Sequence, residues 1–227
     1  MESLFFPFQM PENAKAAIAS QQELRHAVRL QDDFSTPRLI AGIDVGYDMR
    51  HNLGRASVVL LDSATLEPVA SALAFMPVTF PYIPGLLSFR EIPVILKALA
   101  GLPQRPDLLM VDGHGIAHPR RLGIAAHLGV VTDMPSVGVA KSLLVGKYDE
   151  PGPLKGETSP LTDKGEQIGI VLRSRDRTKP LLISAGHRIS HDSALEVVLQ
   201  CLTRYRLPEP TRLADKLSKT PKMAEPG

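Results

Sequence analysis

The amino-acid sequence predicts one α/β domain, built on a mixed β-sheet that is flanked by helices. Three strand-like segments follow one another with short connections in residues 39–78, which predicts an antiparallel meander. Further apolar segments then alternate with helical patterns up to residue 219. No internal repeat or linker divides the 227 residues, so we expect a single domain over 1–227.

The composition is that of an ordinary globular protein in a reducing compartment. Hydrophobic residues make up 44% and charged residues 22% of the chain, which is enough to build a core without disulfides or a structural metal. The single cysteine, Cys201, cannot form an internal disulfide. No apolar run is long enough to span a membrane, and the N-terminal segment lacks a basic start and is broken by Pro7 and Pro11. We expect a cytoplasmic protein without a membrane partner, and a monomer, since nothing indicates an obligate interface.

Positive charge is concentrated in three segments, although the net charge is only +2. Six basic residues lie between Arg204 and the end of the chain, against three acids. Further basic clusters lie in Arg173–Lys179 and in "HPRRLG" at residues 118–123. Such segments are usually solvated surface, but basic patches on a nearly neutral domain also suit a polyanion. Nucleic acid is therefore one class of partner to consider.

The first half of the chain predicts a helix, three strands and a second helix. Apolar residues at helical spacing predict an amphipathic helix over about residues 12–31. Buried-strand patterns follow in residues 39–46, 55–62 and 67–78, with "SAT" at the turn between the last two. A proline-rich entry at residue 81 then leads into a helix that is closed by Gly101 and Pro103.

The second half alternates strands and helices. Residues 106–115 contain four consecutive apolar residues, which predicts a strand buried on both faces. A helix over 119–130 and a strand over 134–141 follow, and then a hairpin of 166–174 with 180–186. Amphipathic helices are predicted over 191–206 and 210–219, and the proline-rich tail from about residue 220 is expected to fray.

Two acids occupy matching positions at the ends of buried strands. Asp44 in "LIAGIDVG" and Asp112 in "LLMVDGHG" each follow an apolar run and lie just before a glycine. An aspartate there often only begins a turn or caps a helix. However, ligands of open α/β sheets bind at the carboxyl ends of strands, and two carboxylates on adjacent strands need a counter-ion. Because carboxylate oxygens select Mg²⁺ or Mn²⁺, a divalent-cation site is the favoured interpretation.

Three further charged residues each allow two interpretations. Ser88 and Glu91 have the S-x-x-E form of a capping box, which explains Glu91 locally, while Pro93 disfavours that explanation. Spacing alone leaves the two explanations of Glu91 tied. Asp215 lies in a predicted terminal helix, where a charged residue usually faces water. Lys141 ends an apolar strand, where a lysine is commonly a surface residue.

Seven motifs of the chain occur in the same order in the endonuclease V family of deoxyinosine-specific repair nucleases. They are "GIDVG", "PYIPGLLSFRE", "VDGHGIAHPRRLGIAAHLG", "SVGVAK", "LTDKGEQIG", "SAGHRIS" and "YRLPEPTRLAD". The chain resembles that family from about Leu39 to Lys216. The motifs "PYIPGLLSFRE" and "DGHGIAHPRRLG" are the most specific part of the resemblance.

The resemblance implies an RNase H-like fold, in which acids from two strands and two helices surround Mg²⁺, which Mn²⁺ can replace. It also settles the tie at Glu91 towards metal chemistry. The implied reaction is hydrolysis of the second phosphodiester on the 3′ side of deoxyinosine in DNA, leaving a 3′-hydroxyl and a 5′-phosphate. Lys141 is expected to add positive charge at the scissile phosphate. At the matching positions, the expected metal ligands and catalytic acids are Asp44, Glu91, Asp112 and Asp215.

The resemblance further implies how a damaged base is recognised. Two prolines stiffen the loop around Tyr82 and Ile83. Together with Pro84, these two residues would fill the gap that a flipped base leaves. A tyrosine packed onto the core is the simpler alternative. The flipped base would be read by Gly85, Leu87 and Gly113, and Ile124 would line its pocket.

Phosphate contacts are expected in two segments of the chain. Both segments also allow a structural reading, because a helix N-terminus explains the first and a capping turn the second. The residues concerned are His118 and Arg120 in the first segment and His187 and Arg188 in the second.

Three other functions compete with cleavage of deoxyinosine-containing DNA. An endoribonuclease specific for inosine in RNA would use the same residues, and only the 2′-hydroxyl distinguishes its substrate. An actin-like kinase is suggested by "GIDVG" and "VDGHG", which resemble phosphate loops, but the chain is too short for two such lobes. A reader of inosine that does not cut would have no need of acids at all four positions.

Overall fold

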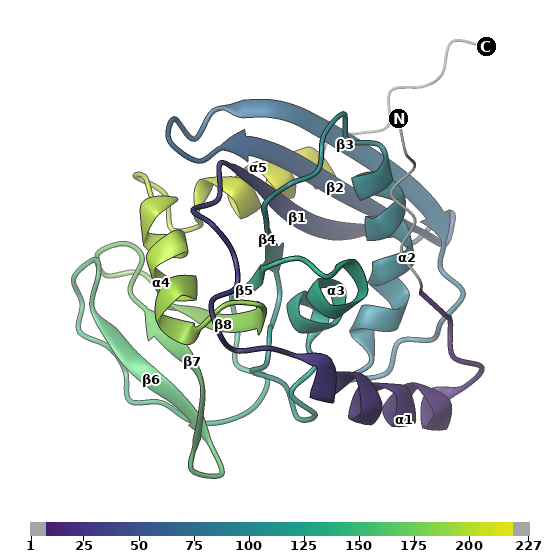
Figure 1. Ribbon diagram of the computed structural model, residues 1–227, viewed down its shortest axis with the longest axis horizontal. Coiled ribbons are helices and arrows are strands. Elements are labelled where there is room, and N and C mark those ends of the chain that lie inside the picture. Colours follow the sequence, from purple (N-terminus) through teal and green to yellow (C-terminus); the bar gives the residue numbers. More distant parts are fainter. Residues whose placement is uncertain (1–7, 220–227) are drawn as a thin grey trace.

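The computed structural model describes residues 8–219, and its eight strands form one sheet (Figure 1). The tail expected from about residue 220 lies outside the described residues. The order across the sheet is β3-β2-β1-β4-β5-β8-β7-β6. The strands are β1 (Leu39–Asp48), β2 (Leu53–Asp62), β3 (Pro68–Pro77), β4 (Leu108–Asp112), β5 (Ser136–Ala140), β6 (Thr158–Asp163), β7 (Glu166–Leu172) and β8 (Leu181–His187).

The sheet is mixed, as the sequence predicts. Strands β1, β2 and β3 form the predicted antiparallel meander. Strand β4 pairs in parallel with β1, and β5 in parallel with β4, whereas β8 runs antiparallel to β5 and β7 to β8. The carboxyl ends of β1, β4 and β5 therefore meet beside the start of β8. We call this the acid end of the sheet, because Asp44 and Asp112 lie there.

Helices cover both faces of the sheet (Figure 1). Helices α2 (Leu87–Ala100) and α3 (Ile124–Thr132) share one core with odd-numbered residues of β1 such as Ile43. Helix α4 (His191–Gln200) shares a second core with Ile40, on the other face. Helix α5 (Glu209–Ser218) lies along β1 and β2 on that second face. Because side chains alternate along a strand, Asp44 faces α5, and Tyr47 faces α2.

Three of the predicted helices are shorter than expected. Helix α1 (Ala14–Leu24) is followed only by a 3₁₀ turn, Arg25–Ala27, instead of continuing to residue 31. Helix α3 begins at Ile124 instead of residue 119, because Arg121 has a φ of 57° and the Gly123 N–H bonds to the Gly115 carbonyl 2.9 Å away. Helix α4 ends at Gln200 instead of residue 206. The buried Cys201 then accepts a hydrogen bond from the Glu209 N–H, which turns the chain into α5.

Strand β6 is a further element, and sequence patterning did not predict it. It pairs antiparallel with β7 at the edge of the sheet. Only Leu161 in this strand is buried, and Pro160 interrupts its backbone donors. Edge strands tolerate proline and lack a two-sided apolar pattern. The spacing of apolar residues therefore did not indicate a strand here. Separately, no helix within residues 8–219 has the length and hydropathy needed to cross a bilayer.

Candidate active site

The pairing of β1 with β4 places two aspartates beside each other. Ile43 is in register with Val111 across this parallel pair, so Asp44 and Asp112 follow on adjacent strands. The even positions of both strands face the same side of the sheet, where Ile40 and Met110 share a core. The two carboxyl groups are close enough for a hydrogen bond between them to contribute to the electrostatics of Asp112.

Helix α5 brings a third aspartate to the same point. A Cβ on Gly42 would lie 1.9 Å from the Pro210 carbonyl oxygen, so only glycine lets the start of α5 approach β1 this closely. One turn later, the Ser57 hydroxyl donates to the Ala214 carbonyl at 2.7 Å. These contacts hold α5 level with β1. As a result, carboxylate oxygens of Asp44, Asp112 and Asp215 all lie within 4.8 Å of one another.

Lys141 supplies positive charge among these acids. It directly follows β5, and its Nζ contacts Asp112 and lies 3.6 Å from Asp215. Burial lowers the pKa of Lys141, but the bond to Asp112 and the neighbouring negative charges outweigh burial and raise it. Burial also raises the pKa of the Asp112 carboxyl to about 6, against the opposing effect of Lys141. Lys219 Nζ also lies 2.7 Å from Asp215 Oδ2, so two ammonium groups compensate the three carboxylates only in part.

Glu91 lies on the other face of the sheet and outside this group of three. Its Oε1 accepts a hydrogen bond from the Tyr47 hydroxyl at 3.0 Å, and Arg90 stacks on the Tyr47 ring. Burial, together with the charges of Asp44 and Asp112, raises the pKa of Glu91 to about 8. An acid in this state is poised to accept a positive partner.

The capping-box explanation of Glu91 is wrong. Helix α2 has Leu86 at its N-cap, and no side chain caps it. Ser88 lies inside the first turn, and its hydroxyl pairs with His127 Nδ1 at 2.9 Å. Pro93 lies within the helix, so the objection that it raised to a helix start near Ser88 is wrong, and the cap is rejected on the other two observations.

The three clustered acids fit a hard divalent cation. All of their donors are carboxylate oxygens, which Mg²⁺ and Mn²⁺ prefer. The oxygens converge from two strands and a helix, all three acids are only partly exposed, and burial together with the charge of Asp44 raises the pKa of Asp112. The donor set thus has the charge, spacing and chemistry that such an ion requires.

A cavity of about 290 Å³ opens beside the acids, and Asp112 forms part of its wall. Its volume is at the lower end of the range for small-ligand sites, about 300–1,000 Å³. Tyr82 stands at its rim with 70% of its surface exposed, so the alternative of a tyrosine packed on the core does not hold. All seven positions expected to meet a lesion line this cavity, namely Tyr82, Ile83, Pro84, Gly85, Leu87, Gly113 and Ile124.

The Gly85 carbonyl is held by side chains from two distant segments. Gly85 has a φ of +78°, a conformation that favours glycine. Its oxygen accepts hydrogen bonds from Arg120 Nη2 at 2.7 Å and Gln21 Nε2 at 3.1 Å. His118 Nδ1 accepts from the Arg120 N–H, which leaves Nε2–H to donate to the same carbonyl at 3.0 Å. His118 and Arg120 therefore fix the cavity wall in this structure and contact the acids at no point.

Comparison with known proteins identifies the family of the chain. A family model described as endonuclease V matches residues 22–216. The chain belongs to the endonuclease V family. Endonuclease V of Azotobacter vinelandii is 58% identical over 198 residues, which cover 87% of this chain and 90% of the relative.

Solved endonuclease V structures share the fold. That of Streptomyces avermitilis superposes with a TM-score of 0.89 at 44% identity, covering 94% of this chain and 95% of the other. Endonuclease V of Ciona intestinalis, in complex with a 24-mer DNA that contains an inosine followed by a ribo-adenosine, gives a TM-score of 0.77 at 30% identity, with coverage of 89% and 94%. The predicted RNase H-like α/β fold is confirmed, and family membership indicates a nuclease.

In this endonuclease V chain, two of the residues expected to contact phosphate lie far from the acids. Ser136 at the start of β5 is in register with His187 at the end of β8, so His187 and Arg188 lie at the opposite end of the sheet. His187 Nε2 lies 3.2 Å from Asp133, and Arg188 Nη1 donates to the Asp133 carbonyl at 2.9 Å. We call this group of Arg29, Asp33, Asp133, His187 and Arg188 the paired end of the sheet.

Sequence reasoning missed two residues that shape the endonuclease V site. The Tyr47 hydroxyl donates to Glu91, and strand alternation places Tyr47 on the same face of the sheet as Glu91, opposite Asp44. Gln21 is buried on α1, where its amide bridges the Gly85 loop and Arg120. A glutamine among the apolar positions of an amphipathic helix was the available signal for Gln21, whereas nothing local marked Tyr47.

Proposed function

We propose that this protein is a DNA repair endonuclease that recognises deoxyinosine and cuts the same strand nearby. One observation carries the proposal, namely that Asp112 belongs both to the acid group and to the wall of the cavity. A base held in that cavity would keep its own backbone within reach of the acids. Endonuclease V of Ciona intestinalis binding inosine-containing DNA supports the choice of base.

The chemistry is that of a divalent cation held by carboxylates. Asp44, Asp112 and Asp215 would hold Mg²⁺ or Mn²⁺, and Glu91 would contribute through water. When bound, such an ion neutralises the scissile phosphate and lowers the pKa of an attacking water. Lys141 would then donate to a phosphate oxygen, where its ammonium stabilises the charge that develops. The products would be a 3′-hydroxyl and a 5′-phosphate at the second phosphodiester on the 3′ side of the lesion.

Recognition would depend on taking the base out of the stack. Tyr82, Ile83 and Pro84 would occupy the space that it leaves, and the cavity from Gly85 to Ile124 would hold hypoxanthine. Flipping costs least for a mispaired base, which favours inosine over a paired adenine. Tyr82→Ala is expected to weaken binding of an inosine strand about 5- to 150-fold, the value of one base–aromatic stack, with cation binding unchanged.

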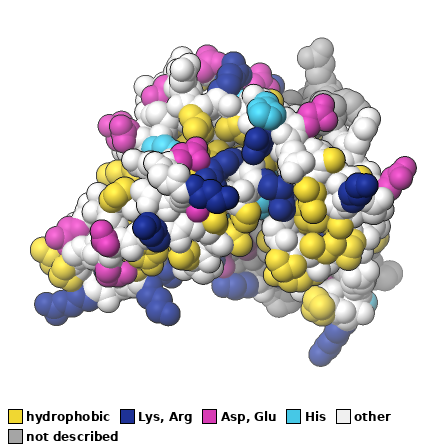
Figure 2. Space-filling model, turned by 90° about the horizontal axis from the view of Figure 1, so that it is seen from below, with side chains coloured by type: hydrophobic (Ala, Val, Ile, Leu, Met, Phe, Trp, Pro, Cys, Tyr) yellow, Lys and Arg dark blue, Asp and Glu magenta, His cyan; other side chains and the backbone are white. Residues whose placement is uncertain are grey.

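The surface charge supports a polyanionic partner. In Figure 2, several Lys and Arg side chains lie together near the middle of the face shown, and others stand separately around its edge. Clustered cations of this kind bind phosphate by releasing counter-ions. Affinity for DNA should therefore fall steeply with salt.

RNA is the second candidate substrate. The DNA in the Ciona intestinalis complex carries a ribo-adenosine directly after the inosine, so a 2′-hydroxyl is accommodated there in that protein. Because the 2′-hydroxyl is the chemical difference near the cut, parallel DNA and RNA strands of one sequence would rank the two substrates.

A nicking assay tests the proposal. Inosine-containing and matched adenine-containing duplexes are incubated with protein, with and without Mg²⁺, and the 3′ ends are mapped. We expect cutting only with inosine and Mg²⁺, at one position on the 3′ side of the lesion. Equal cutting of both duplexes, or none in Mg²⁺ or Mn²⁺, would refute the proposal.

A further inference from the structure

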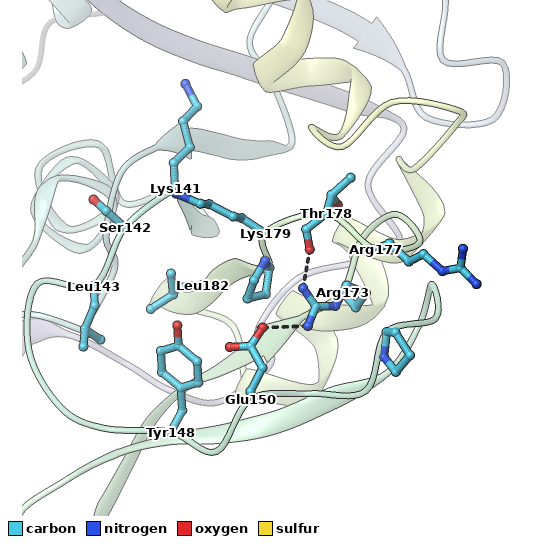
Figure 3. A pocket seen from close by; sticks show the side chains of 12 residues that line it. Lys141, Ser142, Leu143, Tyr148, Glu150, Arg173, Arg177, Thr178, Lys179 and Leu182 are labelled. Atoms are coloured by element: carbon cyan, nitrogen blue, oxygen red, sulfur yellow. Dashed lines mark hydrogen bonds and ion pairs between the residues drawn. The ribbon is translucent and has the colours of Figure 1, made fainter.

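A second, larger depression adjoins the base cavity and has Lys141 in its wall. It encloses about 670 Å³, and both depressions include Ser142 and Leu143 in their walls. We call it the β8 groove, because Lys179, Pro180 and Leu182 at the start of β8 form one wall (Figure 3). Ala140 is in register with Leu182 across the antiparallel pair of β5 and β8, which places Lys141 and the start of β8 at the same end of the sheet.

The walls of the β8 groove are held by buried or half-buried arginines. Arg173 is 7% exposed, and its guanidinium bonds to the Gly152 and Pro151 carbonyls at 2.9 and 2.8 Å. It also contacts Glu150 and the Thr178 carbonyl (Figure 3). Arg206 donates to the Lys179 and Pro180 carbonyls at 2.7 and 3.0 Å. The backbone around Lys179 is therefore fixed from both sides.

Two cations of the groove remain unpaired once these contacts are made. Arg173 is neutralised by Glu150 at 2.6 Å, and Lys141 by the acids. The side chains of Arg177 and Lys179 are exposed and make no hydrogen bond or ion pair with any residue in the described part of the chain. Figure 3 shows Lys179 on the same side of the groove as Lys141, and Arg177 extending outward beyond the rim. Leu182 and Pro153 add apolar surface to the lining of the groove.

We infer that the β8 groove binds the DNA strand on the 3′ side of the cut, with Lys179 and Arg177 on successive phosphates. The inference rests on the proposed function. A strand whose base lies in the cavity and whose scissile phosphate lies at the acids must leave the site past Lys141. The β8 groove adjoins Lys141 there, carries two unpaired cations, and offers apolar surface for sugars, which together match a nucleic-acid strand.

The test combines substrate length with substitution. Inosine-containing single strands keep one 5′ arm and lengthen the 3′ arm one nucleotide at a time. Binding is measured by fluorescence anisotropy with Ca²⁺ in place of Mg²⁺. For the unaltered protein we expect Kd to tighten as the 3′ arm fills the groove. The double variant Arg177→Ala/Lys179→Ala should lose about 2- to 30-fold of that gain, the value of two exposed ion pairs.

Salt dependence gives an independent readout. Each phosphate contact that is lost lowers the slope of log K against log salt by about 0.7 on a single strand. The double variant should show this reduction only with long 3′ arms. Lys97→Ala is the matched control, because Lys97 lies on the last turn of α2, and it should behave like the unaltered protein.

The outcomes separate the two claims. The inference fails if the double variant gains affinity with 3′ length as the unaltered protein does. If the unaltered protein leaves inosine strands uncut in Mg²⁺, the proposed function itself fails. Both substituted side chains are exposed and have no hydrogen bond or ion pair within residues 8–219, so an unchanged Tm is expected for the double variant.

Discussion

The two ends of the central sheet both gather charged side chains, but they differ in how those charges are balanced. At the paired end, Arg29 and Arg188 share the carboxylates of Asp33 and Asp133 at 2.9–3.6 Å. The hydrogen bond from His187 and the nearby arginines lower the pKa of Asp133. At the acid end, burial raises the pKa of Asp112 to about 6 and that of Glu91 to about 8. The paired end matches two arginines to two aspartates, whereas at the acid end Lys141 and Lys219 meet three clustered aspartates.

This difference is what distinguishes a candidate site from solvated surface. Exposed ion pairs contribute little to stability. Their charges are already balanced, so they do not indicate a ligand site. Carboxylates held together against their own repulsion destabilise the fold, and that arrangement is typical of functional sites. The difference between the two ends therefore supports the proposed cation site at the acid end and gives no such support at the paired end. Substitutions at the two ends should have opposite effects.

The largest expected effect is at the acid end. Asp44→Asn or Asp112→Asn should lower the single-turnover nicking rate at least about 10³-fold, because each removes a carboxylate that holds the cation. Stability should not fall with activity, since Asn removes a repelling charge. Thermal unfolding without divalent ions should show an equal or higher Tm for Asp112→Asn. A large loss of Tm together with the loss of nicking would mean that the acids are structural.

Lys141→Ala tests whether this lysine stabilises the transition state or only helps to bind DNA. We expect the single-turnover rate to fall about 10²- to 10³-fold, the usual cost of removing one electrostatic contact in a transition state. The Kd for inosine DNA should change by less than about tenfold. Lys97→Ala, on α2, serves as the control. A loss confined to Kd would show that Lys141 only binds DNA.

The pH dependence of stability tests the raised pKa values directly. A carboxyl with a raised pKa binds its proton more tightly when folded, so stability falls as pH rises through that pKa. Without divalent ions, Tm should therefore decrease between about pH 5 and pH 8.5, the window of Asp112 and Glu91. Because a cation binds the ionised carboxylates, the gain in Tm from Mn²⁺ should be larger at pH 8.5 than at pH 6. A gain that is the same at both pH values would contradict the account.

The smallest effect is expected at the paired end. Asp133→Asn removes an exposed partner of Arg29, Arg188 and His187, so its cost should be within about 1 kcal/mol of unfolding free energy. Nicking of inosine DNA should be unchanged. Urea unfolding measures the unfolding free energy of the variant, and the duplex assay measures its nicking of inosine DNA. Reduced nicking in this variant would place the paired end in contact with DNA and remove the contrast between the two ends.

The sequence predicted the parts of the site that depend on one strand or one short motif. Asp44 and Asp112 stand out because each interrupts an otherwise apolar strand. Glu91 could not be assigned from spacing, because a capping box and an inward-facing acid have the same local pattern. The structure rejects the cap, since Leu86 is the N-cap and Ser88 pairs with His127.

What local pattern alone did not predict depends on contacts between distant segments, and Asp215 was expected only from the family resemblance. Asp215 reaches the acids only because Gly42 admits Pro210 against β1, and no local pattern records that approach. His118 and Arg120 look like phosphate ligands in isolation, but the Gly85 carbonyl uses both. Strand β6 is an edge strand with one buried residue, so its periodicity carries no signal. Local pattern located the acid end, and packing completed it.

A crystal structure with inosine DNA and Ca²⁺ would test the central claim most directly, namely that the acids and the base cavity form one site. We expect a cation bound by Asp44, Asp112 and Asp215 and hypoxanthine in the cavity between Gly85 and Ile124. The DNA backbone should cross from the cavity to the cation. A cation bound elsewhere, or an inosine that stays stacked in the duplex while the acids hold an ion, would contradict it.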